Sequence, residues 1–266
     1  MQHMKDKVAI VTGSTGGIGY GIAGKFLAEG AAVMVTGRDA ERGAKIIKAL
    51  RATGGTADFF AANVQSKADM DALAAATIQR FGRIDIMVAS AGGVPSEETR
   101  SPRVRGIFDT IDVVGVAEVV AKVTVAKLLP VHAVLPHMIE RRAGSCIFVT
   151  SEGGRVPTAG QTTVALYAGG LVMATKVLAK EMARHKVRVN CIAVTLVADS
   201  PAWDAHEGKT PMTALHRAQY ARIAERAPLG IANPQDIGAV AAFLASDESA
   251  FITGTTISPT GGLTFP

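Results

Sequence analysis

Short apolar runs rich in β-branched residues alternate along this chain with longer amphipathic stretches. The first run, at residues 8–11, is followed by a helical pattern at 22–28 and by a second apolar run at 32–36. Continuous apolar runs of this length are typical of parallel strands that are buried on both faces. The same pattern predicts further strands at 56–62, 84–90, 146–150, 187–193 and 256–259.

Helical patterns fill the intervals between these predicted strands. Strictly alternating strands and helices favour an α/β fold, and we expect one doubly wound parallel sheet, Rossmann-like, in a single domain that covers residues 1–266. The long helical stretches 116–139 and 164–183 hold more apolar positions than one sheet face can cover, which predicts subunit contacts through them. Residues 95–106 should form an irregular polar loop, and 194–213 a long loop with a short helical piece, as in a mobile substrate lid.

A glycine-rich turn follows the first predicted strand. It reads Thr12-Gly13-Ser14-Thr15-Gly16-Gly17-Ile18-Gly19 and opens the first helical pattern. Glycines permit a tight turn and let backbone N–H groups approach a pyrophosphate at a helix N-terminus. A ligand-free turn could use the same residues, but the strand–turn–helix context favours a dinucleotide-binding loop.

Composition narrows the classes of partner. The net charge of +5 is spread along the chain and only 5% of the residues are aromatic, so we expect no nucleic-acid site. This positive charge either belongs to solvated surface residues or attracts a phosphate-bearing ligand, such as a nucleotide or a coenzyme A thioester. We expect no membrane-spanning stretch, a cytoplasmic location, buried free thiols at Cys146 and Cys191, and no metal site.

Several short motifs in the second half carry a family resemblance. They are Thr150-Ser151-Glu152-Gly153-Gly154, Leu178-Ala179-Lys180-Glu181, Arg188-Val189-Asn190 and Phe251-Ile252-Thr253-Gly254. Together with the glycine-rich turn and Ala91-Gly92 they resemble the short-chain dehydrogenase/reductase superfamily over essentially the whole chain. The resemblance implies a Rossmann-like fold, NAD(P)-linked oxidoreductase chemistry and tetramers built through paired long helices.

The catalytic residues that this resemblance implies do not stand at their expected spacing. The superfamily places a Tyr thirteen residues after the Ser, a Lys four residues later and an Asn twenty-eight residues before the Ser. Counted from Ser151, the Asn, Tyr and Lys positions hold Val123, Val164 and Ala168. Tyr167 lies nearly one helical turn beyond position 164, so it is either a displaced acid or a packed aromatic whose hydroxyl is bonded at the helix surface.

The resemblance also assigns cofactor-binding positions. They are Gly13, Ser14, Gly17, Ile18, Gly19, Arg38, Asn63, Val64, Ala91 and Gly92. Gly37 stands where the superfamily has the Asp that bonds the ribose 2′-OH, and Arg38 beside it would favour a 2′-phosphate. The residues expected around the nicotinamide depart further from the superfamily pattern. Val194-Thr195 stands where the superfamily has a Pro-Gly pair. We therefore expect NAD(P) binding to be weak or absent.

One carboxylate beside Ser151 is a further candidate. Glu152 is expected to face the mouth of the cleft, either as a capping or solvated side chain or as part of a different acid/base pair. Histidines His132, His137 and His185 fall in helical stretches and are expected to be packing or surface residues.

Two functions follow from these observations. The first is a non-catalytic subunit, similar to those of heteromeric superfamily members such as the benzylsuccinate-pathway hydroxyacyl-CoA dehydrogenase. It would pair with a homologous active subunit in a heterotetramer, or with itself, and its chain would be inactive alone. The second is a divergent NAD(P)-dependent alcohol or ketone oxidoreductase that uses Tyr167 and Ser151.

Overall fold

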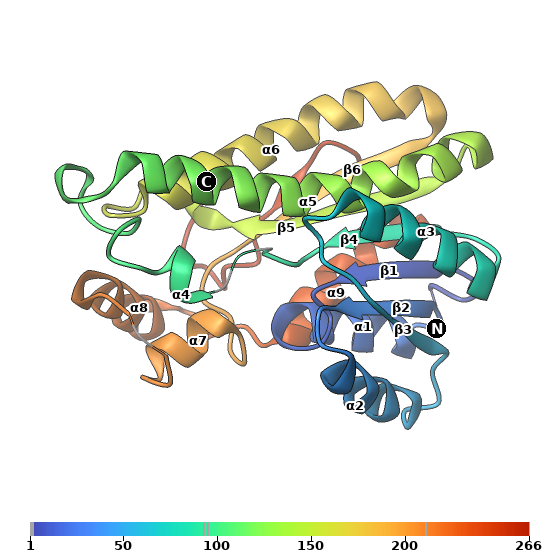
Figure 1. Cartoon of the computed structure of the whole chain (residues 1–266), viewed down its shortest axis with the longest axis horizontal. Coiled ribbons are helices and arrows are strands. Elements are labelled where there is room, and N and C mark those ends of the chain that lie inside the picture. The colour runs from blue at the N-terminus through green and yellow to red at the C-terminus, as the bar shows by residue number, and fades with distance from the viewer. Residues whose placement is uncertain (1–2, 93, 95, 211, 266) are drawn as a thin grey trace.

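One seven-stranded parallel sheet forms the centre of the molecule (Figure 1). The computed structural model describes residues 3–92, 94, 96–210 and 212–265. The strand order is β3-β2-β1-β4-β5-β6-β7, so the sheet is doubly wound, as predicted. Strands are added toward one edge from β1 to β3 and toward the other edge from β4 onward, and the switch lies between β1 and β4. The strands are β1 (Val8–Thr12), β2 (Ala32–Gly37), β3 (Ala57–Ala61), β4 (Ile86–Ala89), β5 (Gly144–Ser151), β6 (Val187–Val194) and β7 (Thr256–Ile257).

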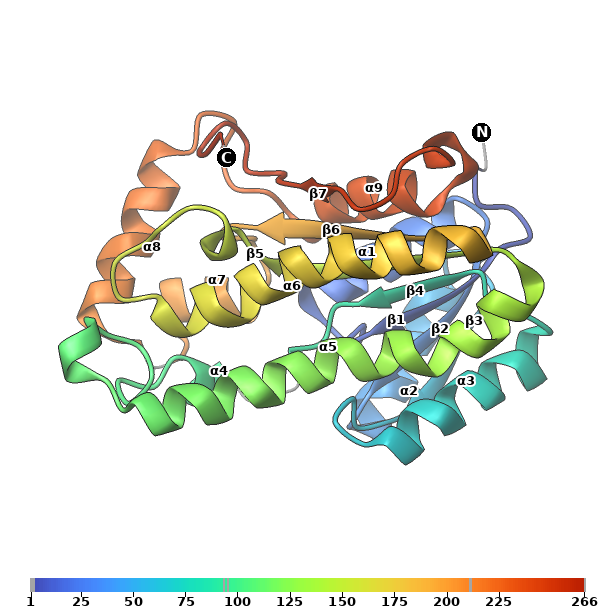
Figure 2. The same ribbon diagram turned by 90° about the horizontal axis from the view of Figure 1, so that it is seen from above.

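Helices cover both faces of this sheet (Figure 2). They are α1 (Gly17–Ala28), α2 (Ala40–Arg51), α3 (Lys67–Phe81), α4 (Ser96–Thr99), α5 (Val113–Arg141), α6 (Thr162–Met182), α7 (Pro201–His206), α8 (Ala214–Arg226) and α9 (Pro234–Ala245). One core cluster joins the sheet to α1, α2 and α9, and the other joins it to α3, α5 and α6. Strands β1, β2, β4, β5 and β6 are mostly buried because both faces of the sheet are covered, which accounts for their continuous apolar runs, whereas the edge strands β3 and β7 are only partly buried.

Helices α1 and α9 pack closely although they lie near opposite ends of the chain. A Cβ atom added at Gly21 would come within 2.4 Å of Pro234, and one added at Gly238 within 2.8 Å of the Gly21 oxygen. Only glycine therefore lets the two helices approach this far. The first helix is thus fixed by the last one.

Helices α5 and α6 lie side by side along one face of the molecule (Figures 1 and 2). Their outer surfaces carry large apolar side chains that are about half exposed, at Val113, Val114, Val125, Leu166, Met173 and Val177. The expected surplus of apolar positions on these helices is therefore present as exposed surface.

Length and composition alone would let one described helical segment, Thr162–His185, cross a membrane. The prediction that the chain has no membrane-spanning stretch rested on composition, and this segment is long and apolar enough to pass a test of that kind. In the fold α6 packs against β5, β6 and α5, and Leu171, Thr175 and Ala179 on it are buried. A core helix between a sheet and a neighbouring helix needs the same apolar composition.

The two predicted loops contain more structure than the sequence suggests. Residues 95–106 include the short helix α4, and Val104 and Arg105 at the end of this loop are buried; Pro95 lies outside the described residues. The segment 194–213 contains α7, the expected short helical piece. Helix α8 follows it, and His216 is its only fully buried residue.

Candidate functional site

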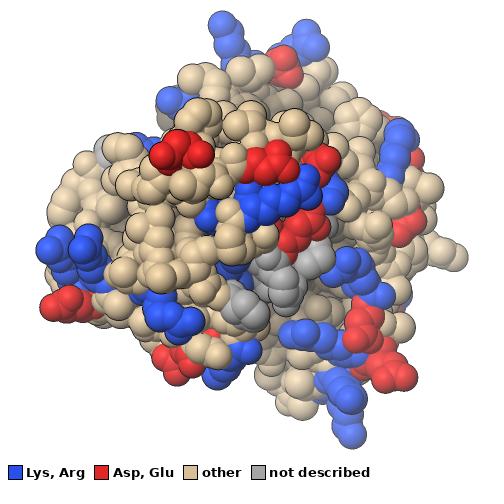
Figure 3. Space-filling model, turned by 60° about the vertical axis from the view of Figure 1, so that its left-hand side comes forward, with Lys and Arg blue, Asp and Glu red and all other residues tan. Residues whose placement is uncertain are grey.

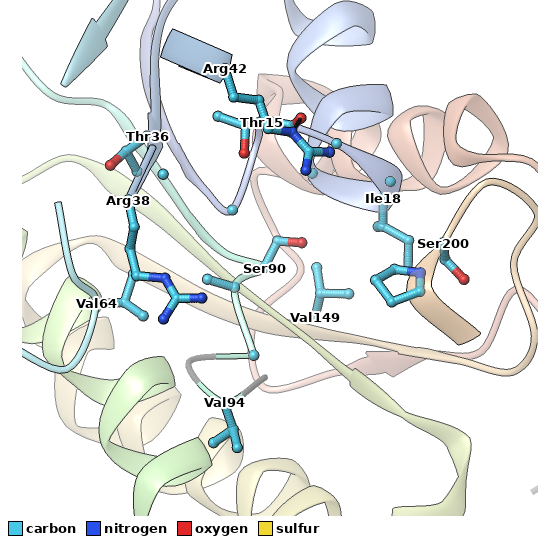
Figure 4. A pocket seen from close by; sticks show the side chains of 18 of the residues that line it. Thr15, Ile18, Thr36, Arg38, Arg42, Val64, Ser90, Val94, Val149 and Ser200 are labelled. Carbon is cyan, nitrogen blue, oxygen red and sulfur yellow. Dashed lines mark hydrogen bonds between the residues drawn. The ribbon is translucent and has the colours of Figure 1, made fainter. Parts of the chain in front are cut away.

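A pocket of about 580 Å³ opens at the carboxyl ends of β1 and β4, where the strand order reverses (Figure 4). Open α/β sheets bind ligands at this point because the loops after the two strands diverge there. Nine of the ten predicted cofactor residues line it, namely Gly13, Gly17, Ile18, Gly19, Arg38, Asn63, Val64, Ala91 and Gly92. The residues that the family resemblance assigns to the cofactor therefore lie together around one pocket.

Glycines in the loop after β1 allow the close approaches that shape this pocket. Gly13 has φ +67°, and a Cβ on it would lie 2.9 Å from the Ala91 Cα. A Cβ on Gly19 would lie 2.5 Å from the Gly13 oxygen. Helix α1 begins after Gly16 with no side-chain cap and no acidic residue in its first turn. Its first N–H groups and its positive dipole end therefore face the pocket, which suits a phosphate.

Ser14 is the predicted cofactor residue that does not line the pocket. Its side chain is buried, and its hydroxyl donates to the Val11 oxygen at 2.5 Å and accepts from the Thr36 N–H at 3.1 Å. The hydroxyl therefore ties β1 to β2 below the turn. Thr15, next in the sequence, has a place on the pocket wall instead.

Two arginines contribute positive charge to the pocket. The Arg38 side chain extends into it between Val64 and Ser90 (Figure 4). Arg42, on α2, donates from Nε to the Thr15 oxygen at 2.9 Å and places its guanidinium over Gly16. Motif spacing did not single out Arg42, because this residue reaches the loop only through the packing of α2. Both guanidinium groups are permanently charged donors for phosphate oxygens.

The turn after β4 forms another wall of the pocket, and two side chains fix it. Thr12 Oγ1 accepts from the N–H groups of Ser90 and Ala91, at 3.0 and 3.1 Å. Lys127, from α5, donates from Nζ to the oxygens of Ala89 and Ser90, at 3.0 and 2.8 Å. Lys127 is only 4% exposed, and burial lowers the pKa of its ammonium group to about 7. Neither motif nor periodicity predicted that Lys127 is buried at this turn.

The three positions that hold catalytic groups in the resembling superfamily are apolar and buried. Val123 belongs to a cluster with Val104, Val116 and Val119, against which Tyr167 packs. The remaining two, Val164 and Ala168, lie on α6 and pack against Gly153 and Gly154 of the short helix η2 (Glu152–Gly154). None of these side chains can donate or accept a proton.

The proposed catalytic pair Ser151 and Tyr167 lies apart from the pocket lining. Ser151 Oγ accepts the Gly153 N–H at 3.2 Å and so caps η2. Tyr167 is partly buried, and its ring packs against a valine cluster that includes Val104, the neighbour of Arg105. Burial raises the pKa of this phenol, while the charge of Arg105 pulls the other way. Its +4 residue, Leu171, is buried and apolar, so no lysine assists Tyr167 from that position.

Glu152 does not face the mouth of the cleft, so that prediction was wrong. It is buried, and its Oε2 accepts the Ser258 hydroxyl at 2.6 Å while its Oε1 has no hydrogen-bond partner. Arg155 donates to Ser258 Oγ at 2.6 Å. Ser258 is the residue directly after β7, so its hydrogen bond holds the Glu152 carboxylate at the β7 edge of the sheet. Position 152 serves packing rather than the pocket.

The remaining wall of the pocket comes from the segment after β6. Asp199, Ser200 and Pro201 line it, and the Asp199 oxygen would lie 3.4 Å from a Cβ at Gly17. Ser200 caps α7 by accepting the Trp203 N–H at 3.2 Å. This segment therefore closes against the glycine-rich loop, and its residues were not among the predicted site residues.

Other sequence candidates have structural roles. Cys146 and Cys191 are buried free thiols, as expected, and burial raises their pKa to about 12 and about 11. His137 Nε2 accepts the Ile84 N–H at 3.2 Å. Over the described part of the chain no group of three His, Cys, Asp or Glu side chains is placed to hold a metal ion.

Known proteins similar to this chain share its whole length. The family model described as enoyl-(acyl carrier protein) reductase matches residues 13–264. A 3-oxoacyl-acyl-carrier-protein reductase, FabG, of Chlamydia pneumoniae is 33% identical over 97% of each chain. Subunit BbsD of a hydroxy(phenyl)methyl-succinyl-CoA dehydrogenase from Thauera aromatica is 32% identical, also over 97% of each chain.

Solved structures agree with these sequence matches. The crystal structure of a short-chain dehydrogenase/reductase from Burkholderia xenovorans, described as putative, superposes with a TM-score of 0.85 at 29% identity, over 98% of this chain and 97% of that one. Levodione reductase superposes with a TM-score of 0.84 at 25% identity, over 97% of both chains.

Proposed function

Because the chain belongs to the short-chain dehydrogenase/reductase family of oxidoreductases, we propose that it is a non-catalytic subunit of a short-chain alcohol dehydrogenase complex. The observation that carries the proposal is the apolar character of Val123, Val164 and Ala168, all buried. General acid catalysis needs a donor within hydrogen-bond reach of the substrate and tuned to the working pH. These positions supply none.

The pocket supports residual binding of the phosphate half of a dinucleotide. Gly13 and Gly19 leave room that a side chain would fill, and the uncapped start of α1 offers free N–H groups. Arg38 and Arg42 favour the 2′-phosphate form, NADP, because no acid stands at the end of β2. The cofactor would supply hydride transfer when bound. We propose weak NADP binding at most, and a cytoplasmic location.

The exposed apolar face of α5 and α6 supports the assembly part of the proposal. Large side chains such as Val114, Leu166 and Met173 are more than half exposed there. Faces of this kind mark subunit contacts. The Thauera relative is named as a subunit of a CoA-thioester dehydrogenase, which supports a heteromeric partner and a CoA-type substrate for the complex. We propose a heterotetramer with an active homologue.

Two measurements on purified protein test the catalytic part. The isolated chain should not turn over NADH or NADPH with alcohol or ketone substrates, including 3-oxoacyl thioesters. Tyr167→Phe should leave that baseline unchanged. Steady-state turnover that Tyr167→Phe abolishes would refute the proposal and favour a divergent NAD(P)-dependent oxidoreductase that uses Tyr167 and Ser151.

Co-expression with the active homologue encoded nearest to this chain in its genome tests the assembly part. Native mass spectrometry should give a mixed tetramer, and Met173→Glu on the exposed face of α6 should dissociate it. The control is Lys180→Glu, on an exposed position of the same helix. A stable homomer that ignores an independently active homologue would contradict the subunit role.

A further inference from the structure

Arg105 is a buried cation with an unsatisfied donor. It lies at the end of the loop before η1 (Phe108–Thr110), is 8% exposed, and its Nε has no hydrogen-bond partner. No described Asp or Glu forms an ion pair with it. An isolated buried charge is strongly unfavourable, so such a group is normally paired or binds a ligand of opposite charge. Arginine cannot escape by losing its proton.

A second buried group without a partner comes from a separate segment. His216 on α8 is 3% exposed, and its Nε2 makes no hydrogen bond. Its Nδ1 lies 2.6 Å from Thr213 Oγ1, which fixes the ring. Burial, with the charges of Arg105 and Arg100, lowers the pKa of His216 to about 4. The imidazole is therefore neutral at pH 7, and the positive charge of Arg105 contributes to the lowered pKa.

Tyr167 completes the group from α6. Its ring packs on the valine cluster formed by Val104, Val116, Val119 and Val123, and the positive charge of Arg105 lowers the pKa of its hydroxyl against the larger effect of burial. The segments that carry these side chains lie against one another: Thr163 on α6 donates to the Val104 oxygen, and a Cβ on Gly160 would lie 2.5 Å from the Leu215 side chain of α8 and 3.5 Å from Gly106. No described Asp or Glu forms an ion pair with Arg105 or His216.

We propose that Arg105, His216 and Tyr167 form a binding site for an organic carboxylate whose apolar part lies against the valine cluster. The guanidinium Nε–H would donate to the carboxylate, and His216 Nε2–H and the Tyr167 hydroxyl offer further donors. This site is separate from the nucleotide pocket, because none of its three residues lines that pocket.

Helix α8 is suited to open over this site. His216 is its only fully buried residue, and among its apolar side chains Leu215 lies against Gly160 but none is fully buried. It is also tied to the body by the Gln219 side chain, which accepts from the Gln161 side chain and donates to the Ala159 oxygen. Figure 3 shows the end of the molecule where α8 lies, and acidic and basic side chains are interspersed there rather than gathered by sign. Selectivity for an anion would therefore come from the buried groups.

Butyrate and its neutral isostere butyramide are the probes that test this proposal. The isolated chain, without nucleotide, should bind butyrate and not butyramide in a calorimetric titration. Trp203 on α7, the one tryptophan of the chain, lies near α8 and gives a fluorescence readout. Arg105→Met should abolish butyrate binding, and Arg103→Met, an exposed arginine two residues earlier, should not. Equal binding of both probes, or of butyrate to Arg105→Met, would overturn the proposal.

A second readout guards against misfolding of the variant. In the wild-type protein, saturating butyrate should raise the NMR titration midpoint of His216 by about one pH unit or more, because a nearby anion stabilises the imidazolium. The signal is assigned with His216→Asn. An unshifted midpoint at saturation would contradict the site. Neither measurement depends on catalysis or on a partner subunit, so the outcome is independent of the proposed function.

Discussion

Lys127 makes the stability of this fold depend on pH in a way that one substitution should reverse. Its Nζ is buried and bonded to two backbone oxygens, and burial lowers its pKa from 10.5 to about 7. Between these values the unfolded chain binds a proton that the folded chain does not, so stability rises with pH across this window. At about 1.4 kcal/mol per tenfold ratio, the group lowers stability by about 4 kcal/mol at pH 7 and about 2 kcal/mol at pH 9.

Lys127→Met removes this penalty and also two hydrogen bonds. The Ala89 and Ser90 oxygens then lack a donor, which costs about 2 kcal/mol in total at any pH. The variant should therefore be more stable than the wild type by about 2 kcal/mol at pH 7, and the two stability curves should cross near pH 9. Above the crossing the wild type should be the more stable protein.

Urea unfolding at pH 7, 8 and 9 measures the difference directly. Lys122→Met is the matched control, because Lys122 lies on the same helix with its side chain about half exposed. Its stability difference from the wild type should stay small and nearly constant over the same range. If the difference in unfolding free energy between the wild type and Lys127→Met does not change with pH, the lowered pKa of Lys127 in the folded state is refuted.

Four further outcomes follow from the geometry. Arg38→Ala should weaken NADPH binding more than NADH binding in a fluorescence titration, and equal effects would contradict a role toward the 2′-phosphate. Ala168→Lys should lower unfolding free energy by about 3 kcal/mol or more, because position 168 is fully buried against Gly154, and an unchanged urea midpoint would contradict this. Asp85→Ala should cost about 2 to 3 kcal/mol, since Asp85 accepts the Val8 N–H and pairs with Arg83, whereas Asp71→Ala on exposed α3 should cost little. Gly19→Ala should remove any nucleotide binding, because its Cβ would meet the Gly13 oxygen, and retained affinity would count against the loop as a phosphate site.

The sequence predicted the sheet well because burial on both faces leaves a continuous apolar run. All seven predicted strands are present, and the glycine-rich turn lies where a phosphate loop should. Ser14 does not line the pocket, because the motif does not tell which side of the turn a serine faces. The other nine residues assigned to the cofactor line one pocket, and cofactor binding itself stays a prediction.

The sequence could not predict residues whose position depends on contacts between distant parts of the chain. Arg42 reaches the phosphate loop only because α2 packs beside it. Arg105, in a predicted polar loop, and Lys127, in a predicted apolar helix, are charged residues that are nevertheless buried. Glu152 is buried because Ser258, more than a hundred residues later, donates a hydrogen bond to its carboxylate. Such burial is decided by tertiary packing, which periodicity along the chain does not encode.

The contact between α1 and α9 has a consequence for synthesis on the ribosome. Helix α1 ends at Ala28 and α9 begins at Pro234, so about 200 residues are made after the first helix before its cover exists. At about 5 to 20 residues per second this interval lasts roughly 10 to 40 s. During that time the apolar side of α1, with Ile22 and Phe26, has no α9 to pack against. Until translation is nearly finished, the side of the first helix that α9 covers in the folded protein therefore lacks this partner.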